Sequence, residues 1–358
     1  MIPPPEADAG PADGTAVRLS ICIATFKRGQ FIGQTLDSII AQLQAGVEIV
    51  IVDGASPDTT PEVVAAYASR HPQVRYFRES VNSGVDQDYD KSVGYARGEY
   101  CWLMTDDDVL VDGAIARVLH ELTLAPDLVV VNARVEDSAL GRILNPGLLP
   151  VTGGRWYAES EMGEFFSRTG SYLSFIGAVV IRRRLWLQRD RAPYFGTLFV
   201  HFGVIFQAPR LHSASVIGSP LIRLRYGNSM WSPRGFEIWL FKWPRLVWSF
   251  GGFTDAEKSA VSPLHPWHQL RKIFMYRAIG GYGLAEYRQH FGERMPMVSR
   301  ALLLAIALVP GRLANSLASA YCLFSPVKGR MSLHDLVHSS HATAATRAAA
   351  RFAGIERR

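Results

Sequence analysis

Apolar and polar positions follow two different periods along the first third of the chain. Short, nearly continuous apolar runs predict strands buried on both faces, since each face of such a strand must meet other apolar groups. Between these runs, apolar residues recur at the spacing of one face of a helix. The predicted strands are residues 19–24, 47–52, 74–77, 99–104 and 127–135, and the predicted helices are 31–43, 86–96 and two that begin at Thr60-Pro61-Glu62 and at Asp112.

This order of elements predicts the fold class. Strands and helices alternate four times within about 110 residues, which is typical of α/β proteins. We expect a doubly wound, mostly parallel sheet with flanking helices, followed by a helical C-terminal region. The expected divisions are a leader over residues 1–16, the α/β domain over 17–225, a helical, aromatic-rich region over 226–330 and a basic tail over 331–358.

Composition narrows the setting of the protein without naming its partner. A chain of 358 residues that is 48% hydrophobic is long enough for one large domain or slightly more. The net charge of +6 suits nucleotides, lipid diphosphates or an acidic membrane surface. Three cysteines without a CxxC motif indicate buried thiols in a reducing cytosol. Residues 1–16 lack a basic segment and an apolar segment, so we expect a disordered leader and not a signal peptide.

Three consecutive carboxylates follow the strand predicted at 99–104. Asp106, Asp107 and Asp108 repel one another, so their placement at the end of a buried strand favours a divalent cation that also holds phosphates. The position just beyond the carboxyl end of a parallel strand is also where open α/β sheets bind ligands. The alternative is a solvated acidic turn that caps the next helix.

Polar side chains also follow the other predicted strands. The dinucleotide motif GxGxxG is missing after the first two strands and the phosphate-loop motif GxxxxGK[ST] is missing throughout, which argues against a dehydrogenase or a phosphate-loop enzyme. Acids here can accept from a base or ribose, and cations can meet phosphate. Each residue alone is more often a turn or capping residue, but together they indicate a nucleotide-diphosphate site. The residues are Thr25, Lys27, Arg28, Asp53, Ser56, Asp58, Asn82, Asp86 and the acidic triplet.

Four segments of the chain resemble family 2 glycosyltransferases with the GT-A fold. They are SICIATFKRG, IVIVDGASPDTT, NSGVDQDYDKSVGYARGEYCWLMTDDD and FIGAVVIRR. Within the family, the triplet and a later segment with a histidine most resemble abequosyltransferase-type O-antigen enzymes. The resemblance implies a nucleotide-sugar donor bound by Thr25, Arg28, Asp53, Ser56, Asp86, Thr105 and Asp106, and Mg²⁺ or Mn²⁺ bound by Asp107 and Asp108.

One position departs from the family's pattern. Thr105 stands where the DXD-type motif has its first Asp, so which carboxylate contacts the ribose and which binds the metal stays open. The resemblance further implies an inverting transfer to a hydroxyl of a saccharide acceptor. The expected acceptors are lipid-linked saccharides used in the synthesis of bacterial surface polysaccharides.

The catalytic base has two main candidates. The family's base is a carboxylate in a Glu-Asp pair, whereas residues 192–203 of this chain contain no carboxylate. His201 lies there, and a histidine with a pKa near ~6.5 can serve as a base at neutral pH; the alternative is a core histidine. Asp190 is the rival base, and Glu161 and Glu164 are further candidates.

The C-terminal third suggests a membrane surface. Five tryptophans alternate with cations, as in helices that lie in a membrane interface, although an aromatic helical lid has the same pattern. Residues 301–309 are apolar but too short to span a bilayer, which takes ~20 residues, and Pro310-Gly311-Arg312 ends the run. The tryptophans are Trp231, Trp239, Trp243, Trp248 and Trp267, and the cations are Arg234, Lys242 and Arg245.

From these features we expect a cytoplasmic protein that is peripheral at the inner face of the cell membrane, with no nucleic-acid partner and a loose basic extension over residues 334–358. Two other functions remain open. A sugar nucleotidyltransferase shares the sheet but requires a glycine-rich loop with a lysine after the first strand, which this chain lacks. A catalytically inactive binding scaffold is compatible with Thr105 and the missing Glu-Asp pair.

Overall fold

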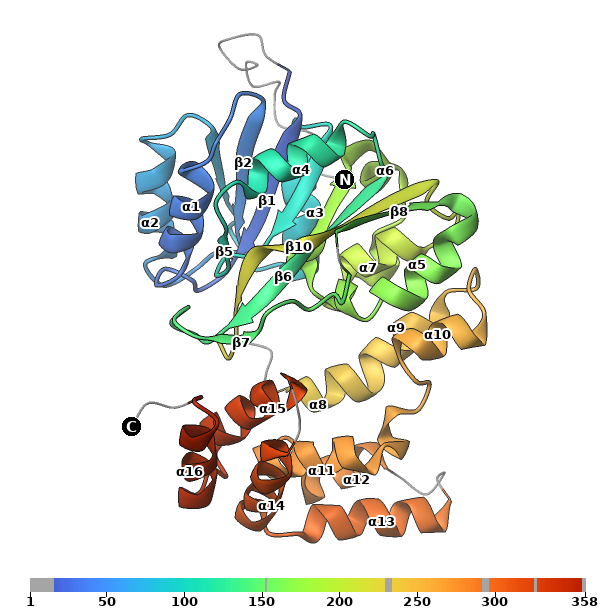
Figure 1. Ribbon diagram of the computed structural model, residues 1–358. Helices are drawn as coiled ribbons and strands as arrows, with labels where there is room; N and C mark the ends of the chain where they lie inside the picture. Colours follow the sequence, from blue (N-terminus) through green and yellow to red (C-terminus); the bar gives the residue numbers. More distant parts are fainter. Residues whose placement is uncertain (1–15, 152, 229–233, 292–295, 325–326, 356–358) are drawn as a thin grey trace. The chain divides into compact units, whose positions relative to one another are not determined.

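The computed structural model describes most of the chain in two compact units (Figure 1). The described residues are 16–151, 153–228, 234–291, 296–324 and 327–355. Apart from Ala16, the predicted leader therefore lies outside them. The first unit is Met1–Asn132, Val151–Met162 and Tyr172–Ile222, and the second is Ala133–Pro150, Gly163–Ser171 and Arg223–Arg358. Residues 133–150, 163–171 and 223–225 of the expected α/β domain thus belong to the second unit.

A ten-stranded sheet contains the predicted parallel strands at one side. In spatial order these are β3 (Val74–Arg78), β2 (Val47–Asp53), β1 (Leu19–Thr25) and β4 (Tyr100–Met104), all parallel. Every residue of β1, β2 and β4 is buried, as their continuous apolar runs predict. The fold class expected from the sequence is confirmed.

The rest of the sheet is mixed. β9 (Val179–Arg182) pairs antiparallel with both β4 and β6 (Leu128–Glu136), so it lies between two strands that precede it in the chain. The order continues through β10 (Ser213–Arg225) to β5 (Val109–Leu110). Off this path, β7 (Ile143–Asn145) pairs with β6 and β8 (Gly154–Ala158) pairs with β10.

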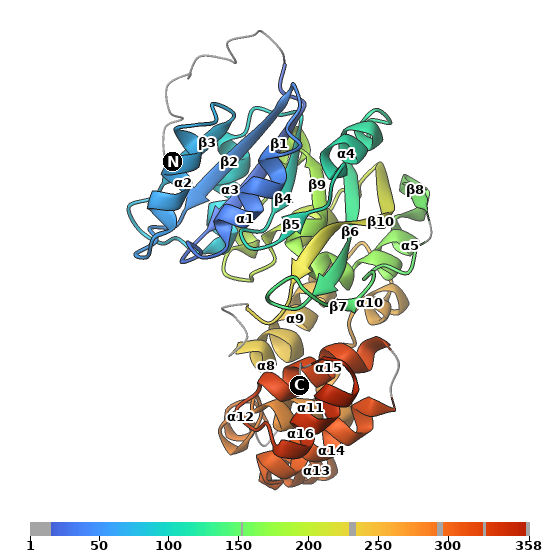
Figure 2. The same ribbon diagram turned by 60° about the vertical axis from the view of Figure 1, so that its left-hand side comes forward.

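Helices connect the parallel strands on both faces of the sheet. The strand order β3-β2-β1-β4 reverses direction at β1, and right-handed crossovers then place α1 and α2 on one face and α3 on the other. Figures 1 and 2 show this arrangement. Pro61 lies in the first turn of α2, where its missing N–H costs nothing. The helices are α1 (Ile32–Ile40), α2 (Thr60–Ala68), α3 (Val85–Tyr95), α4 (Ala114–Leu122), α6 (Arg183–Gln188) and α7 (Val200–Phe206).

The second unit is mainly helical. Its helices are α5 (Met162–Thr169), α8 (Gly235–Glu237), α9 (Trp243–Ser249), α10 (Asp255–Val261), α11 (Leu270–Ile279), α12 (Leu284–His290), α13 (Met297–Leu308), α14 (Gly311–Leu323), α15 (Val327–His338) and α16 (Ala344–Phe352). Two short helical turns of this unit cover Ile238–Lys242 and Pro266–His268. Four others belong to the first unit and cover Glu159–Glu161, Tyr172–Ser174, Ile176–Ala178 and Ala192–Tyr194.

The expectation of a loose extension over residues 334–358 is wrong for the part of it that the structure describes. Residues of α15 and α16 belong to a buried cluster with α14, in which Leu336 and Ala350 are fully buried. A Thr343 side chain caps α16 by accepting from the Thr346 N–H. The segment is rich in alanine, and its small apolar side chains are buried only because neighbouring helices pack against them.

The tryptophans of the second unit mostly pack within it. Trp243 is buried and lies edge-on to Trp239, with ring centres 5.9 Å apart. Trp267 stacks on Phe241 with ring centres 5.3 Å apart, and the Trp248 indole N–H donates to the Ser262 carbonyl. Trp231 lies outside the described residues. These contacts are those of an aromatic helical core.

Among the described residues, no single helix has both the length and the apolar character needed to cross a membrane. Taken together, Met297–Leu308 and Gly311–Leu323 pass that test, but their axes meet at 98°. The apolar run at 301–309 ends as expected, since α13 stops at Leu308 before Pro310.

Candidate functional site

The register of the parallel strands brings the predicted site residues to one edge of the sheet. Thr25 at the end of β1 lies opposite Asp53 at the end of β2. Ile23 lies opposite Met104 of β4, so two residues further on, Thr25 is next to the acidic triplet. Parallel strands share their carboxyl edge, and the chain segments that follow them therefore meet there.

Arg28 lies between two carboxylates of the triplet. Its Nε is 3.5 Å from Oδ1 of Asp106, and one Nη is 3.6 Å from Oδ2 of Asp107. The Arg28 backbone N–H donates to the Thr60 hydroxyl at 2.8 Å, which fixes the start of the loop that carries the guanidinium. The site thus holds a buried cation and carboxylates in direct contact, as the strand-end residues predict.

Negative charge at the triplet is only partly balanced. Burial and the neighbouring Asp107 carboxylate raise the pKa of Asp106 to about 7, although Arg28 and the Thr25 hydroxyl act in the opposite direction. The Thr105 hydroxyl donates to Oδ2 of Asp108 at 2.5 Å. Thr105, which replaces an acid of the family's motif, therefore supports the last carboxylate of the triplet.

The donor set fits a hard divalent cation. The described residues contain no group of three histidine, cysteine, aspartate or glutamate side chains arranged to hold a metal. Mg²⁺ and similar ions, however, take one or two carboxylates and complete their shell with water and substrate phosphates. Burial and the Asp107 carboxylate raise the pKa of Asp106 even beside Arg28, as expected where carboxylates crowd together. Asp107 and Asp108 would hold such an ion, with Asp106 beside them.

A second group of contacts joins the loops after β1 and β2. The Ser56 hydroxyl accepts from the Lys27 N–H at 3.0 Å, and the Ser56 N–H donates to Oδ1 of Asp53 at 2.8 Å. The Tyr76 hydroxyl donates to the other oxygen of Asp53 at 2.8 Å. Asp53 is fully buried, and these bonds hold its carboxylate between the two loops.

The backbone at this edge is held in unusual conformations. Lys27 and Ala55, in the two loops, and Leu198, just before α7, have positive φ angles of 58°, 61° and 72°. Such conformations cost energy for residues with a Cβ atom and persist only where the surroundings impose them. Gly29 has a different constraint, because a Cβ there would lie 2.3 Å from the Thr59 hydroxyl oxygen.

Asp58 supports the same loop. Its carboxylate accepts from the Gly29 N–H at 3.2 Å and from the Thr60 hydroxyl at 2.6 Å. Burial acts to raise the pKa of Asp58, but these hydrogen bonds prevail and hold it below its usual value. Asn82 accepts from the Gly84 N–H at 2.8 Å, as a turn residue does.

Asp86 connects α3 to the segment that begins α7. Its Oδ2 accepts from the Leu198 N–H at 2.8 Å, and its Oδ1 accepts from the Val200 N–H at 3.0 Å. The side chain is buried, and these two bonds occupy both carboxylate oxygens. In this structure Asp86 therefore positions the start of α7, whereas its expected contact with the nucleotide sugar stays a prediction.

His201 lies in the first turn of α7. Its Nε2 is 2.9 Å from the Leu173 carbonyl oxygen, and since a carbonyl only accepts, Nε2 carries the hydrogen. Burial lowers the pKa of His201 to about 4, so the ring is neutral at pH 7 and Nδ1 has a free lone pair. Within the described part of the chain, Nδ1 is buried and has no hydrogen-bond partner, and the side chain is 1% exposed.

Asp190 lies at the other end of α7. Its backbone carbonyl accepts from the Gln207 side chain at 2.8 Å, and the neighbouring Arg189 donates to carbonyls at the end of the helix. The seven residues of α7 span about 10 Å. Asp190 is exposed, but His201 is on the helix end that Asp86 holds beside the start of α3.

The two glutamates proposed as further bases have partners nearby. Glu161 accepts from the Ala158 N–H at 2.9 Å, and Glu164 pairs with Arg168 at 2.7 Å. Glu161 belongs to the first unit and Glu164 to the second. Neither pairing indicates a base.

Three residues of the site were missed from the sequence. Tyr76 donates to Asp53, and the buried Tyr89 hydroxyl donates to the Met104 carbonyl at 3.0 Å, directly below the triplet. Asp88 lies so close to Gly54 that a Cβ at position 54 would be 2.6 Å from its Oδ2. The helical spacing of Tyr89 from Asp86 was a signal that it shares one face of α3 with that residue.

Known proteins resemble this chain in sequence and in fold. Residues 20–189 match the model of the family Glycosyl transferase family 2. Abequosyltransferase RfbV of Salmonella typhimurium is 28% identical to this chain over 233 residues, which are 61% of this chain and 69% of that relative.

Two solved structures share the fold over most of the chain. S. aureus TarS in complex with UDP-GlcNAc has a TM-score of 0.57 at 14% identity, covering 95% of this chain and 93% of its own. The mannosyltransferase PcManGT from Pyrobaculum calidifontis, in complex with GDP-Man and Mn²⁺, has a TM-score of 0.51 at 17% identity, covering 96% and 89%. At such identities the likeness concerns the fold alone.

Proposed function

Because the chain belongs to glycosyl transferase family 2 through residues 20–189 and has the GT-A fold, we propose that it transfers a sugar, with inversion, from a nucleotide-diphosphate sugar to a hydroxyl of a saccharide. The observation that carries this proposal is the contact of Arg28 with Asp106 and Asp107 at the carboxyl edge of the sheet. Buried carboxylates that one guanidinium cannot balance suit a site that receives a metal together with a diphosphate.

The donor fits this edge with its base toward β2 and its diphosphate toward the triplet. Asp53, Ser56 and Thr25 offer acceptors and a hydroxyl to the base and ribose, while Arg28 offers charge to phosphate. Mg²⁺ or Mn²⁺ would be held by Asp107 and Asp108, with Asp106 and Thr105 beside them. When bound, the ion would neutralise the charge of the departing diphosphate. TarS with UDP-GlcNAc and PcManGT with GDP-Man and Mn²⁺ support this choice of ligands.

The base of the proposed reaction is His201, with Asp190 as the alternative. The hydrogen bond from Nε2 to Leu173 fixes the tautomer, so Nδ1 is the nitrogen that would take the proton of the acceptor hydroxyl. The side chain is 1% exposed, so the acceptor reaches Nδ1 only if residues packed around it move aside. Asp190 is open to solvent but lies at the far end of α7.

The proposed acceptor is a lipid-linked saccharide at the inner face of a bacterial membrane, in the synthesis of a surface polysaccharide. Similarity to an abequosyltransferase supports a saccharide acceptor. The excess of basic residues suits a lipid diphosphate.

The test is release of nucleoside diphosphate from a panel of nucleotide sugars, with and without Mn²⁺, in the presence of bacterial lipid-linked saccharides. We expect one donor to be consumed only with metal and to yield a product of inverted configuration. A nucleotidyltransferase would release pyrophosphate from a nucleoside triphosphate and a sugar phosphate instead. A binding scaffold would consume no donor, and either result would contradict the proposal.

A further inference from the structure

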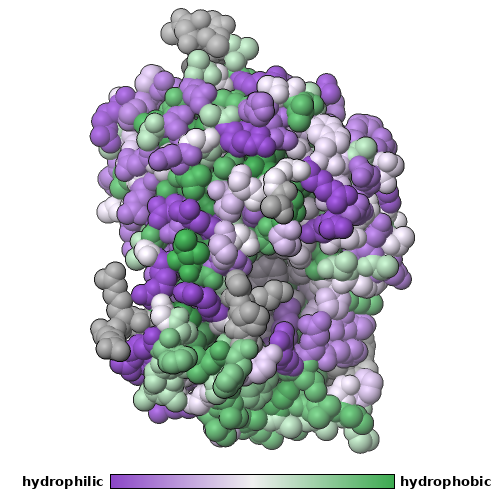
Figure 3. Space-filling view, in the orientation of Figure 1, coloured by the Kyte–Doolittle hydropathy of each residue, from purple (hydrophilic) through white to green (hydrophobic). Residues whose placement is uncertain are grey.

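Exposed apolar side chains concentrate in one segment of the second unit. Nine of the eighteen large apolar side chains that are exposed in the described part of the chain lie between Met297 and Phe324. They are Met297, Val298, Leu302, Leu308, Leu313, Leu317, Tyr321, Leu323 and Phe324. Figure 3 shows hydrophobic residues gathered at the lower end of the view, where Figure 1 labels α13 and α14. A contiguous apolar patch of this kind marks an interaction surface.

The exposed side of α13 contains no polar residue after its first turn. Its exposed positions from Ala301 onward are Ala301, Leu302, Ala305 and Leu308. On the opposite side, Leu303 and Ala307 are buried in the helical core. A helix that is apolar on all sides belongs either in a protein core or in contact with lipid, and the outer side of α13 is not in the core.

Like α13, α14 has an exposed apolar side and a buried side. Its outer side presents Leu313, Leu317 and Tyr321 at helical spacing. Its inner side is held in place: Asn315 donates to the carbonyls of Ala278 and Leu336, each at 3.1 Å. The outer side is therefore a fixed feature of the surface.

The bend between the two helices is also anchored. The Arg277 Nε donates to the Val309 carbonyl at 2.7 Å, which satisfies a backbone group at the end of α13. Helices of 12 and 13 residues span about 18–20 Å each, which is short of the ~30 Å bilayer core. With one side packed on protein and an angle of 98° between them, the pair suits a position along a lipid surface.

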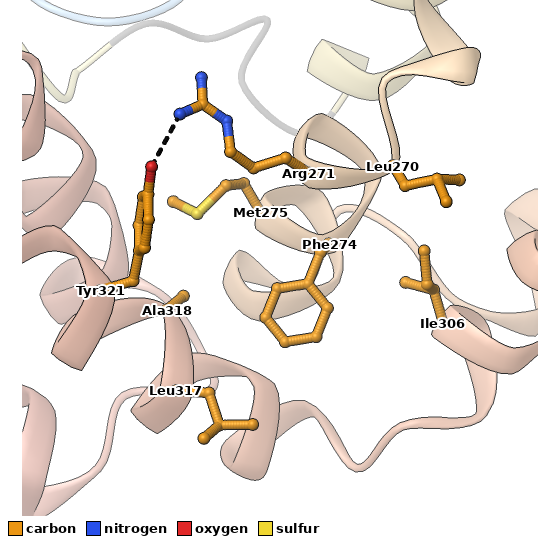
Figure 4. A pocket seen from close by; sticks show the side chains of 8 residues that line it. All are labelled: Leu270, Arg271, Phe274, Met275, Ile306, Leu317, Ala318 and Tyr321. Atoms are coloured by element: carbon orange, nitrogen blue, oxygen red, sulfur yellow. Dashed lines mark hydrogen bonds between the residues drawn. The ribbon is translucent and has the colours of Figure 1, made fainter.

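An apolar groove of about 390 Å³ opens beside the same helices. Phe274 and Met275 of α11 face Ala318 and Tyr321 of α14 (Figure 4). At its edge, an Nη atom of Arg271 donates to the Tyr321 hydroxyl at 3.0 Å. The groove thus combines an apolar lining with a cation at its margin, as a lipid chain and its phosphate require.

The charge of the segment matches one class of partner. Residues 297–324 include Arg300 and Arg312 and no aspartate or glutamate. Such a bias attracts the negative surface of a membrane that contains anionic lipids. A second copy of the same surface would bring like charges together.

We propose that the outer side of α13 and α14 docks on a lipid bilayer that contains anionic lipids, with the apolar side chains in the interface and the cations at the headgroups. This surface differs from the tryptophan-rich region in which the sequence suggests membrane contact. It does not depend on the identity of the reaction, because lipid binding requires neither donor nor acceptor.

The test is co-sedimentation of the full chain with vesicles of phosphatidylcholine alone and with vesicles that also contain phosphatidylglycerol. We expect binding to the anionic vesicles, and a loss of about tenfold or more in the double variant Leu302→Glu/Leu317→Glu, since charged groups resist burial among lipid chains. The matched control Val81→Glu/Leu124→Glu changes two exposed apolar residues of the first unit and should bind as the native chain does. Arg300→Gln/Arg312→Gln should weaken anionic binding about fivefold per arginine.

A second measurement covers a failure of the glutamate variant to fold. An environment-sensitive fluorophore on Leu317→Cys should shift to the blue with anionic vesicles, whereas one on Leu124→Cys should not; the three native cysteines are buried. Absence of vesicle binding by the native chain, or equal binding by the Leu302→Glu/Leu317→Glu variant, would overturn the proposal. So would a fall in the oligomeric mass of that variant with unchanged vesicle binding, which would assign the surface to a second copy.

Discussion

Asp106 and Asp107 share the guanidinium of Arg28, and this sharing decides the charge state of the site. With distances of 3.5 and 3.6 Å, Arg28 lies within ion-pair range of both carboxylates. The pKa of Asp106 near 7 follows from its burial and from Asp107. The crowded carboxylates repel one another, and a bound cation would relieve that repulsion.

The variant Asp106→Asn tests this repulsion in metal-free buffer. Because the folded-state pKa of Asp106 is raised, the native chain loses stability as pH rises from about 4 to about 7, and the neutral amide avoids that loss. We expect the variant to be more stable than the native chain by on the order of 4 kcal/mol at pH 8, with the difference falling close to zero at pH 4. Chemical unfolding at the two pH values measures the difference, and an equal difference at both would contradict the account.

His201 provides an opposite pH dependence. Its folded pKa of about 4 lies below the unfolded value near 6.5, so the unfolded chain takes up a proton first as pH falls. The native chain should lose up to about 3 kcal/mol relative to His201→Gln between pH 6.5 and pH 4. If His201 is the base, the same variant should also lower kcat about 10²–10⁴-fold with little change in donor affinity.

Comparison with Asp190→Asn separates the two bases. That variant removes an exposed carboxylate and should leave stability unchanged. Inactive Asp190→Asn together with active His201→Gln would move the base to Asp190. Unchanged activity in both would exclude the two residues as bases.

At the scale of elements, the connection between α3 and α7 joins parts of the chain that are more than a hundred residues apart. Asp86 accepts from Leu198 and Val200, and Trp186 and Arg191 both donate to Asp90 one turn further along α3. The bonds from Leu198 and Val200 hold the start of α7, and with it His201, beside α3.

The variant Asp86→Ala should loosen this connection. One buried and one partly buried backbone N–H group would lose a charged acceptor, at a cost of about 2–4 kcal/mol in the free energy of unfolding. Hydrogen exchange should accelerate at Leu198 and Val200 while β1 and β2 stay protected. The neighbouring exposed residue gives the control Gln87→Ala, and equal exchange in both variants would show that Asp86 does not hold α7.

The sequence predicted the strands of the parallel region because each is a continuous apolar run, and the shared carboxyl edge then followed from their direction. It did not predict that β9 enters between β4 and β6, since strand order depends on pairing between distant segments. The hydrogen bonds of Asp86 to Leu198 and Val200 were not predicted either, because they also join distant segments. In α15 and α16, small residues bury well only against α14, and composition alone does not reveal such a partner.

At the scale of the whole molecule, the protein combines a mixed α/β sheet with a helical unit whose surface is apolar and basic. Donor binding is assigned to the first unit and lipid docking to the second. The two properties can therefore be tested apart, with vesicles for one and soluble nucleotides for the other.

The most direct test of the central claim is nucleotide binding that depends on the metal and on the triplet. Thermal unfolding should be followed with UDP and GDP, with and without Mn²⁺, in the native chain, in Asp107→Ala and in the control Asp112→Ala, which removes a nearby exposed carboxylate. A ligand that binds only the folded state raises the melting temperature. We expect one nucleotide to raise it only with Mn²⁺, in the native chain and in Asp112→Ala but not in Asp107→Ala. A rise that is equal without metal, or equal in Asp107→Ala, would contradict the account.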